Sequence, residues 1–128
     1  MEIKGKDIDM SPQHIIKELA QFREKLAKLN GEIIKLGNQK SKAEYDYRLL
    51  KAKKIVKLRY DKTPVTIIPD LVKGDPDVAE LKLQLDALEV LYDNKRENIR
   101  SLRDVMSVYQ SILNYLKIEI GGNLNIGG

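Results

Sequence analysis

The feature that most constrains this chain is an unbroken alternation of three- and four-residue steps between apolar positions in its second half. All but one of the positions are apolar or tyrosine, and they are Val78, Leu81, Leu85, Leu88, Tyr92, Lys95, Ile99, Leu102, Met106, Tyr109, Leu113, Leu116 and Ile120. This repeat places its members on one face of an α-helix, as in coiled coils. The second half is therefore predicted to be one long helix that packs along a partner helix.

The first half of the chain carries a second series with the same spacing, which predicts that partner helix. Its members are Ile15, Leu19, Phe22, Leu26, Leu29, Ile33, Leu36, Lys40, Ala43, Tyr47 and Leu50. Past Leu50 the register is expected to shift to a new stripe made of Tyr45, Leu49, Ala52, Val56 and Tyr60. Gly31 and Gly37 each cost about 1 kcal/mol relative to Ala in a helix. One helix rather than two is expected, with 37–38 as the place for any kink.

Prolines and glycines indicate the boundaries of the elements. Ser11-Pro12 and Asp75-Pro76 each combine an N-cap residue with a proline at the first helical position. Two prolines and six β-branched residues exclude a helix over 61–75, and 66–68 could form a short strand. Gly121 is suited to end the second helix. The predicted organisation is an N-terminal arm (1–10), a helical-hairpin domain (11–120, with helix 11–60, loop 61–75 and helix 76–120) and a flexible tail (121–128).

These elements predict an all-α fold, a long antiparallel helical hairpin or coiled coil with an irregular 15-residue tip loop. Each helix would be ~65 Å long at 1.5 Å per residue. Apolar residues off the two series suggest a second buried face, among them Ile16, Ile34, Leu83 and Val108. We therefore expect a homo-oligomer, a dimer that forms a four-helix bundle.

The composition argues against most kinds of chemistry. There is no cysteine, and His14 is the one histidine, which excludes thiolate sites and any site with two histidine ligands. We expect no catalytic residue, no metal, no cofactor, no small-molecule substrate and no enzyme activity. No apolar run approaches the ~18 residues of a membrane-spanning helix, and residues 1–10 do not read as a signal peptide. A cytoplasmic protein without a membrane partner is expected.

Between Tyr47 and Tyr60 the chain has six cations and no acid, namely Arg48, Lys51, Lys53, Lys54, Lys57 and Arg59. Such a stretch looks like a nucleic-acid footprint, and Lys51, Lys53, Lys54 and Lys57 are the candidate phosphate contacts. A hairpin that pairs Tyr60 with Asp77 would instead bring the acids of 75–93 beside these cations. DNA contact and cross-helix ion pairing are therefore alternatives.

The same pairing would bring Lys40 and Lys95, the basic residues of the two series, to one level. We interpret them as a polar layer that fixes the register of the helices, with an anion or partner site as the alternative.

The predicted tip loop is longer and more apolar than a helix connection needs. It could fold back as a cap or contact a partner. The candidate partner-binding residues are Val65, Ile67, Ile68, Asp70, Leu71 and Lys73.

Three segments carry a resemblance to a known family: Ala-Glu-Tyr-Asp-Tyr-Arg at 43–48, Pro-Val-Thr-Ile-Ile-Pro-Asp-Leu at 64–71, and Lys-Gly-Asp at 73–75. They resemble small uncharacterised helical proteins of phages and prophages of Gram-positive bacteria, encoded among early genes for recombination and replication. The likeness covers roughly residues 40–116. It implies a host-cytoplasm location and a role in DNA metabolism or host-factor control, without a catalytic site.

Three hypotheses about function follow. The first is a non-enzymatic helical interaction protein, a phage-encoded accessory or inhibitor that binds a protein of DNA metabolism or host defence. The second is a DNA-binding protein that uses the basic stretch 48–59. The third is a structural or chaperone-like coiled-coil hairpin.

Overall fold

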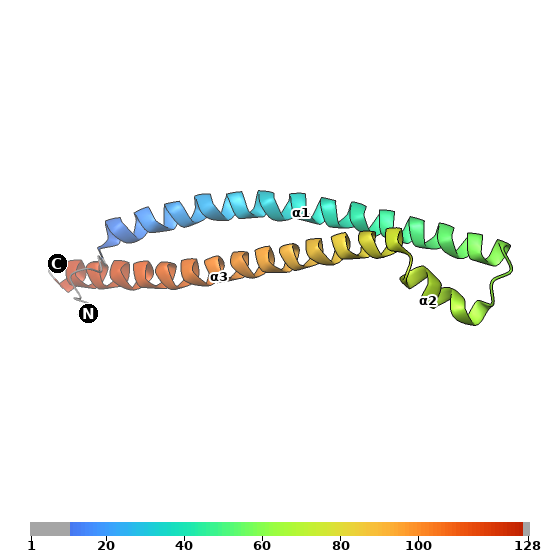
Figure 1. Ribbon diagram of the computed structural model, residues 1–128. Helices are drawn as coiled ribbons and strands as arrows, with labels where there is room; N and C mark the ends of the chain where they lie inside the picture. The colour runs from blue at the N-terminus through green and yellow to red at the C-terminus, as the bar shows by residue number, and fades with distance from the viewer. Residues whose placement is uncertain (1–10, 127–128) are drawn as a thin grey trace, which may run out of the picture. The chain divides into compact units, whose positions relative to one another are not determined.

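The computed structural model describes the backbone of residues 11–126 and the side chains of residues 11–119 (Figure 1). Its elements are α1 (Pro12–Tyr60), the short 3-10 helix η2 (Val65–Ile67), α2 (Ile68–Lys73) and α3 (Pro76–Ile126). The predicted all-α class is confirmed, because no strand occurs in this part of the chain. The predicted N-terminal arm at 1–10 lies outside the described residues.

Both predicted helix starts are confirmed by their capping hydrogen bonds. The His14 backbone N–H donates to Ser11 Oγ at 3.2 Å. At α3, one carboxylate oxygen of Asp75 accepts from the backbone N–H groups of Asp77 and Val78 at 3.0 and 3.1 Å. These caps satisfy N–H groups that have no partner inside the helix. α1 then continues through Gly31 and Gly37 as one helix, as expected.

The end of α1 is a Schellman turn with a lysine at the position that usually needs glycine. Lys62 has a φ of 60°, and its N–H donates to the Arg59 carbonyl at 3.0 Å. The next N–H, that of Thr63, donates to the Leu58 carbonyl at 3.0 Å. This pair of bonds defines the motif, and it reverses the chain sharply after Tyr60.

The predicted irregular loop over 61–75 is wrong, and so is the short strand at 66–68. The segment holds η2 and α2 instead. Pro64 precedes η2 and Pro69 lies in the first turn of α2, where a missing N–H costs no helical hydrogen bond. Ile68 and Val72 are one turn apart on α2, and both are buried. Burial of this pair outweighs the weak helix propensity of β-branched residues.

The chain divides into two compact units, which we describe separately. The first consists of Met1–Asn30 and Glu97–Gly128. In it the beginning of α1 packs antiparallel to α3, and Ile15, Leu19 and Leu113 are buried together. The Phe22 and Tyr109 rings meet edge to face with centroids 5.1 Å apart. The predicted series therefore do face each other here. The expected helix end at Gly121 is wrong, since α3 continues to Ile126.

The second unit is Gly31–Arg96 and contains the end of α1, η2, α2 and the beginning of α3. Its core is formed by Ile68 and Val72 of α2 and Val78 of α3. Half-buried residues of α1 pack against this core, namely Tyr47, Leu50, Ile55 and Leu58.

The expected register shift after Leu50 is wrong. Tyr45, Leu49, Val56 and Tyr60 are 64%, 41%, 67% and 86% exposed. The inward face of α1 instead continues through Ile55 and Leu58, because α2 packs on that side and gives these residues apolar neighbours. The predicted pairing of Tyr60 with Asp77 is also wrong. Lys54 faces Asp75 and Asp77, since α2 takes the place beside the last turns of α1.

Candidate interaction surfaces around α2

The six residues predicted as a partner-binding loop fall into two groups. Ile68 is 4% exposed and packs in the core of the second unit. Val65, Ile67 and Leu71 are 67%, 45% and 47% exposed, and Asp70 and Lys73 are exposed as well. Folding of the segment into α2 therefore turns one apolar side inward and leaves another on the surface.

An apolar groove of about 510 Å³ lies where α1, α2 and α3 of the second unit meet. Its apolar walls are formed by Tyr47, Ile55, Ile68, Pro69, Val72 and Val78. Three lysines, Lys51, Lys73 and Lys82, complete the lining. We call this the tip groove. Apolar walls with a few charged groups are typical of binding sites.

Two of the three lysines of the tip groove lie close to one aromatic ring. The ammonium groups of Lys51 and Lys82 lie 5.7 and 5.6 Å from the centroid of the Tyr47 ring, within reach of a cation–π interaction. Lys82 also pairs with Asp86 at 2.9 Å. The hydrogen bond from Lys82 to this carboxylate, with its charge, raises the pKa of Lys82 above the ordinary 10.5. Lys82 therefore keeps its positive charge at neutral pH.

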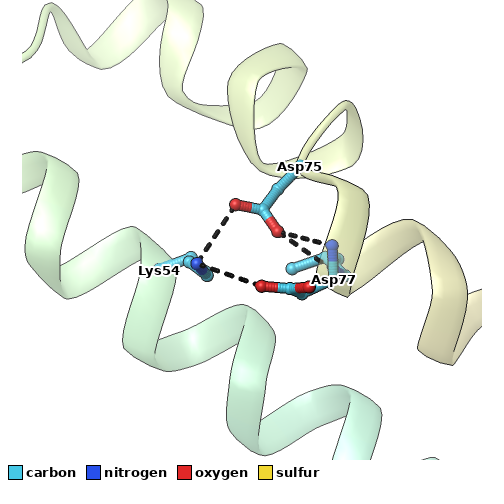
Figure 2. A network of polar contacts seen from close by, with 4 residues as sticks. Lys54, Asp75 and Asp77 are labelled. Carbon is cyan, nitrogen blue, oxygen red and sulfur yellow. Dashed lines mark hydrogen bonds and ion pairs between the residues drawn. The ribbon is translucent and has the colours of Figure 1, made fainter.

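A second groove, of about 340 Å³, lies on the other side of α2. It is lined by Lys54, Lys57, Leu58, Asp61, Leu71, Val72 and Asp75. Next to it, Lys54 Nζ lies 3.2 Å from Asp75 Oδ2 and 3.9 Å from Asp77 Oδ2 (Figure 2). The backbone N–H of Val78 and then Lys54 lower the pKa of Asp75 below its ordinary 3.8, against an opposing effect of burial. This network ties the start of α3 to α1.

The four candidate phosphate contacts do not share one environment. Lys54 was expected to stay free, and this is wrong, because it is paired with the two aspartates. Lys51 lies over Tyr47. Lys53 and Lys57 are exposed, and neither makes an ion pair with any residue over 11–119.

Lys40 and Lys95 take different partners instead of forming one polar layer. Lys95 Nζ forms an ion pair with Glu32 Oε2 at 2.7 Å. The Lys40 ammonium lies 5.1 Å from the centroid of the Tyr92 ring. The expectation that both lysines lie at one level rested on pairing Tyr60 with Asp77, and it does not hold with the observed pairing.

The sequence interpretation missed the α1 and α3 walls of the tip groove. Tyr47 and Val78 were assigned to the two apolar series, and Ile55 belongs to neither of them. A signal was present, since Ile68 and Val72 have helical spacing and Pro69 precedes a helical turn. A helix over 68–73 has to bury its apolar side against another apolar surface. Predicting this helix would therefore have led to a search for that surface on the two long helices.

Comparison of the chain with protein-family models, curated proteins and solved structures found no match. Over the described residues, no group of three or more His, Cys, Asp or Glu side chains is arranged to hold a metal ion. Within the same range, neither long helix contains a stretch apolar enough to cross a membrane.

Proposed function

We propose that this protein is a non-enzymatic helical binding protein that holds a protein partner at the tip groove. The observation that carries the proposal is an apolar groove at a three-helix junction whose charged lining residues are all lysines. The resemblance at 43–48, 64–71 and 73–75 supports a partner from DNA metabolism or host defence.

The chemistry of the groove specifies the kind of segment it would accept. Apolar walls take up an aliphatic or aromatic side chain, and burial of such a side chain contributes about 1.5–3 kcal/mol. Lys51 of α1 and Lys73 of α2 add positive charge to the lining. A segment with carboxylates next to large apolar residues satisfies both requirements. Val65, Ile67 and Leu71 are exposed apolar residues outside the groove.

A displayed library of random dodecapeptides tests this proposal directly. Selection on the wild-type chain should enrich peptides that combine aspartate or glutamate with large apolar residues. The recovered peptides are then synthesised, and their affinity is measured by fluorescence anisotropy. The groove variant Lys51→Glu/Lys73→Glu should lose at least tenfold in affinity. Enrichment that lacks carboxylates, or affinity that this variant leaves unchanged, would count against the tip groove.

The matched control is Lys53→Glu/Arg59→Glu. It changes the net charge of the chain by the same amount on the same half of the molecule, and neither residue lines the tip groove. Its peptide affinity should stay within about twofold of wild type, which separates a local effect of the groove from a general effect of charge.

DNA binding is a second candidate function, and one observation favours it. Lys53, Lys57 and Arg59 lie within two turns of α1, are exposed, and form no ion pair among the residues whose side chains are described. Binding of a short labelled duplex should weaken with salt, with a logarithmic slope of about −0.9 per phosphate contacted. Here the two double variants exchange roles: Lys53→Glu/Arg59→Glu should abolish binding, and Lys51→Glu/Lys73→Glu should retain more of it. Absence of binding at low salt would eliminate this candidate.

A further inference from the structure

The side of α1 that faces away from the core carries an apolar stripe between cations. The stripe consists of Tyr45, Leu49, Ala52, Val56 and Tyr60, whose spacing places them on one side of the helix. Exposed cations lie along it, namely Arg48, Lys53, Lys57 and Arg59. Arg48 pairs with Glu44 at 2.8 Å, and the other three have no described ion pair. We call this the basic outer face.

In the same unit, α3 carries an apolar stripe of its own on the side away from its buried residues. It consists of Ala79, Leu83, Ala87 and Val90, and Leu83 and Val90 are 64% and 59% exposed. Exposed acids lie along it, namely Glu80, Asp86 and Asp93. Asp86 and Asp93 also pair with Lys82 and Arg96 of the same helix, which lie further from the stripe. We call this the acidic outer face.

From these two faces we propose that the chain associates with copies of itself, with the basic outer face of one copy on the acidic outer face of the next. The stripes have similar lengths, about 22 Å for 45–60 and about 17 Å for 79–90 at 1.5 Å per residue. The alanines in both stripes allow close approach of the helix backbones. Charges of opposite sign then meet along the edges of an apolar contact, the arrangement that selects partners in helical pairs.

Charge also argues against the other ways of covering these stripes. Two basic outer faces brought together would place lysines and arginines against each other, and two acidic outer faces would do the same with carboxylates. A duplex backbone would use the cations and leave Tyr45, Leu49 and Val56 without apolar contact. An anionic membrane surface could cover the basic outer face, but it would leave the acidic one uncovered. Contact between copies makes use of both kinds of face.

The proposed contact joins two different surfaces, so it does not close on itself as a two-fold dimer does. An open assembly of any number of copies keeps one basic outer face uncovered at one end and one acidic outer face uncovered at the other. Such head-to-tail contacts give open-ended assemblies or rings. This proposal therefore differs from a two-fold dimer that completes a four-helix bundle.

Two variants test the proposal, each of which removes the apolar centre of one face without changing charge. Leu49→Gln/Val56→Gln alters the basic outer face, and Leu83→Gln/Val90→Gln alters the acidic one. Wild-type chain should show a mass by sedimentation velocity that increases with protein concentration and decreases with added salt. Each variant alone should stay a monomer, because its one intact face finds no intact counterpart. An equimolar mixture should form a one-to-one pair and stop there.

The control carries Ile16→Gln and Ile118→Gln, two exposed apolar residues that lie on neither face, and it should assemble as wild type does. Far-ultraviolet circular dichroism should show the same helix content in all variants. A wild-type chain that stays monomeric from micromolar to millimolar concentration overturns the proposal. So does a dimer formed by either Gln variant alone, which would indicate a contact between two like faces. Binding of wild type to anionic vesicles without self-association would also overturn it.

Discussion

The packing of α2 against α1 makes a quantitative prediction about two neighbouring isoleucines. Ile68 is 4% exposed and packs with Val72 and Val78, whereas Ile67 is 45% exposed. Ile→Ala in a well-packed core costs about 2–5 kcal/mol, depending on how far the site can collapse. The tip groove next to Ile68 gives the structure room to relax. We therefore expect Ile68→Ala to cost about 2–3 kcal/mol and Ile67→Ala less than about 1 kcal/mol.

The measurement must report on the second unit, because α2 is short and the first unit contributes much of the helical signal. Amide hydrogen exchange gives that local information. The Gly74 N–H donates to the Asp70 carbonyl at 3.0 Å and the Asp75 N–H donates to the Val72 carbonyl at 3.2 Å. Both amides should exchange at least tenfold faster in Ile68→Ala than in Ile67→Ala, since a loss of 1.4 kcal/mol in opening free energy is a factor of ten.

The two substitutions control each other, since they remove the same atoms from adjacent residues. Equal protection of the Gly74 and Asp75 amides in both variants would refute the argument that α2 is held by burial of Ile68. Faster amide exchange in Ile67→Ala than in Ile68→Ala would refute it more strongly, because it would mean that Ile67 and not Ile68 faces the core.

Three further predictions address single features. Lys62→Gly should stabilise the chain against urea by about 0.5–1 kcal/mol, since glycine adopts a φ of 60° without the strain that a side chain brings. Phe22→Leu should cost about 1 kcal/mol by removing the edge-to-face contact with Tyr109, as measured by thermal unfolding. The pKa of Asp75 is lowered in the folded chain, so its stabilising effect is present above the ordinary 3.8 and is lost as pH falls through the lowered folded value. Asp75→Asn should therefore be less stable than wild type at neutral pH, and the difference should shrink in acid.

Much of the fold could be predicted from local sequence signals. The heptad spacing identifies positions that are buried in the structure, such as Leu19, Leu85 and Ile99. The caps at Ser11 and Asp75 could be predicted for the same reason, because a cap depends on residues within one turn.

The tip could not be predicted from the same signals, because it is decided by contacts between distant residues. The left-handed conformation of Lys62 has no sequence signature, since glycine or asparagine would be expected there. Pro64 and Pro69 suggested an irregular loop, but both lie where a helix tolerates proline. What makes α2 a helix is the apolar surface on α1 and α3 that covers Ile68 and Val72.

The position of α2 also determines what happens to the charges of the second unit. Because α2 lies beside the last turns of α1, α3 starts opposite Lys54, and Lys54 is the one cation of 48–59 with a described ion pair to α3. Glu80, Asp86 and Asp93 are exposed on α3 and do not reach the cations of α1 in the same chain. The sequence suggested that the acids of α3 neutralise the cations of 48–59 within one hairpin. Most of these cations are not paired with α3 in this way. In our proposal contact between copies completes this neutralisation, so added salt should weaken assembly while leaving the more buried Lys54–Asp75 pair and the fold in place.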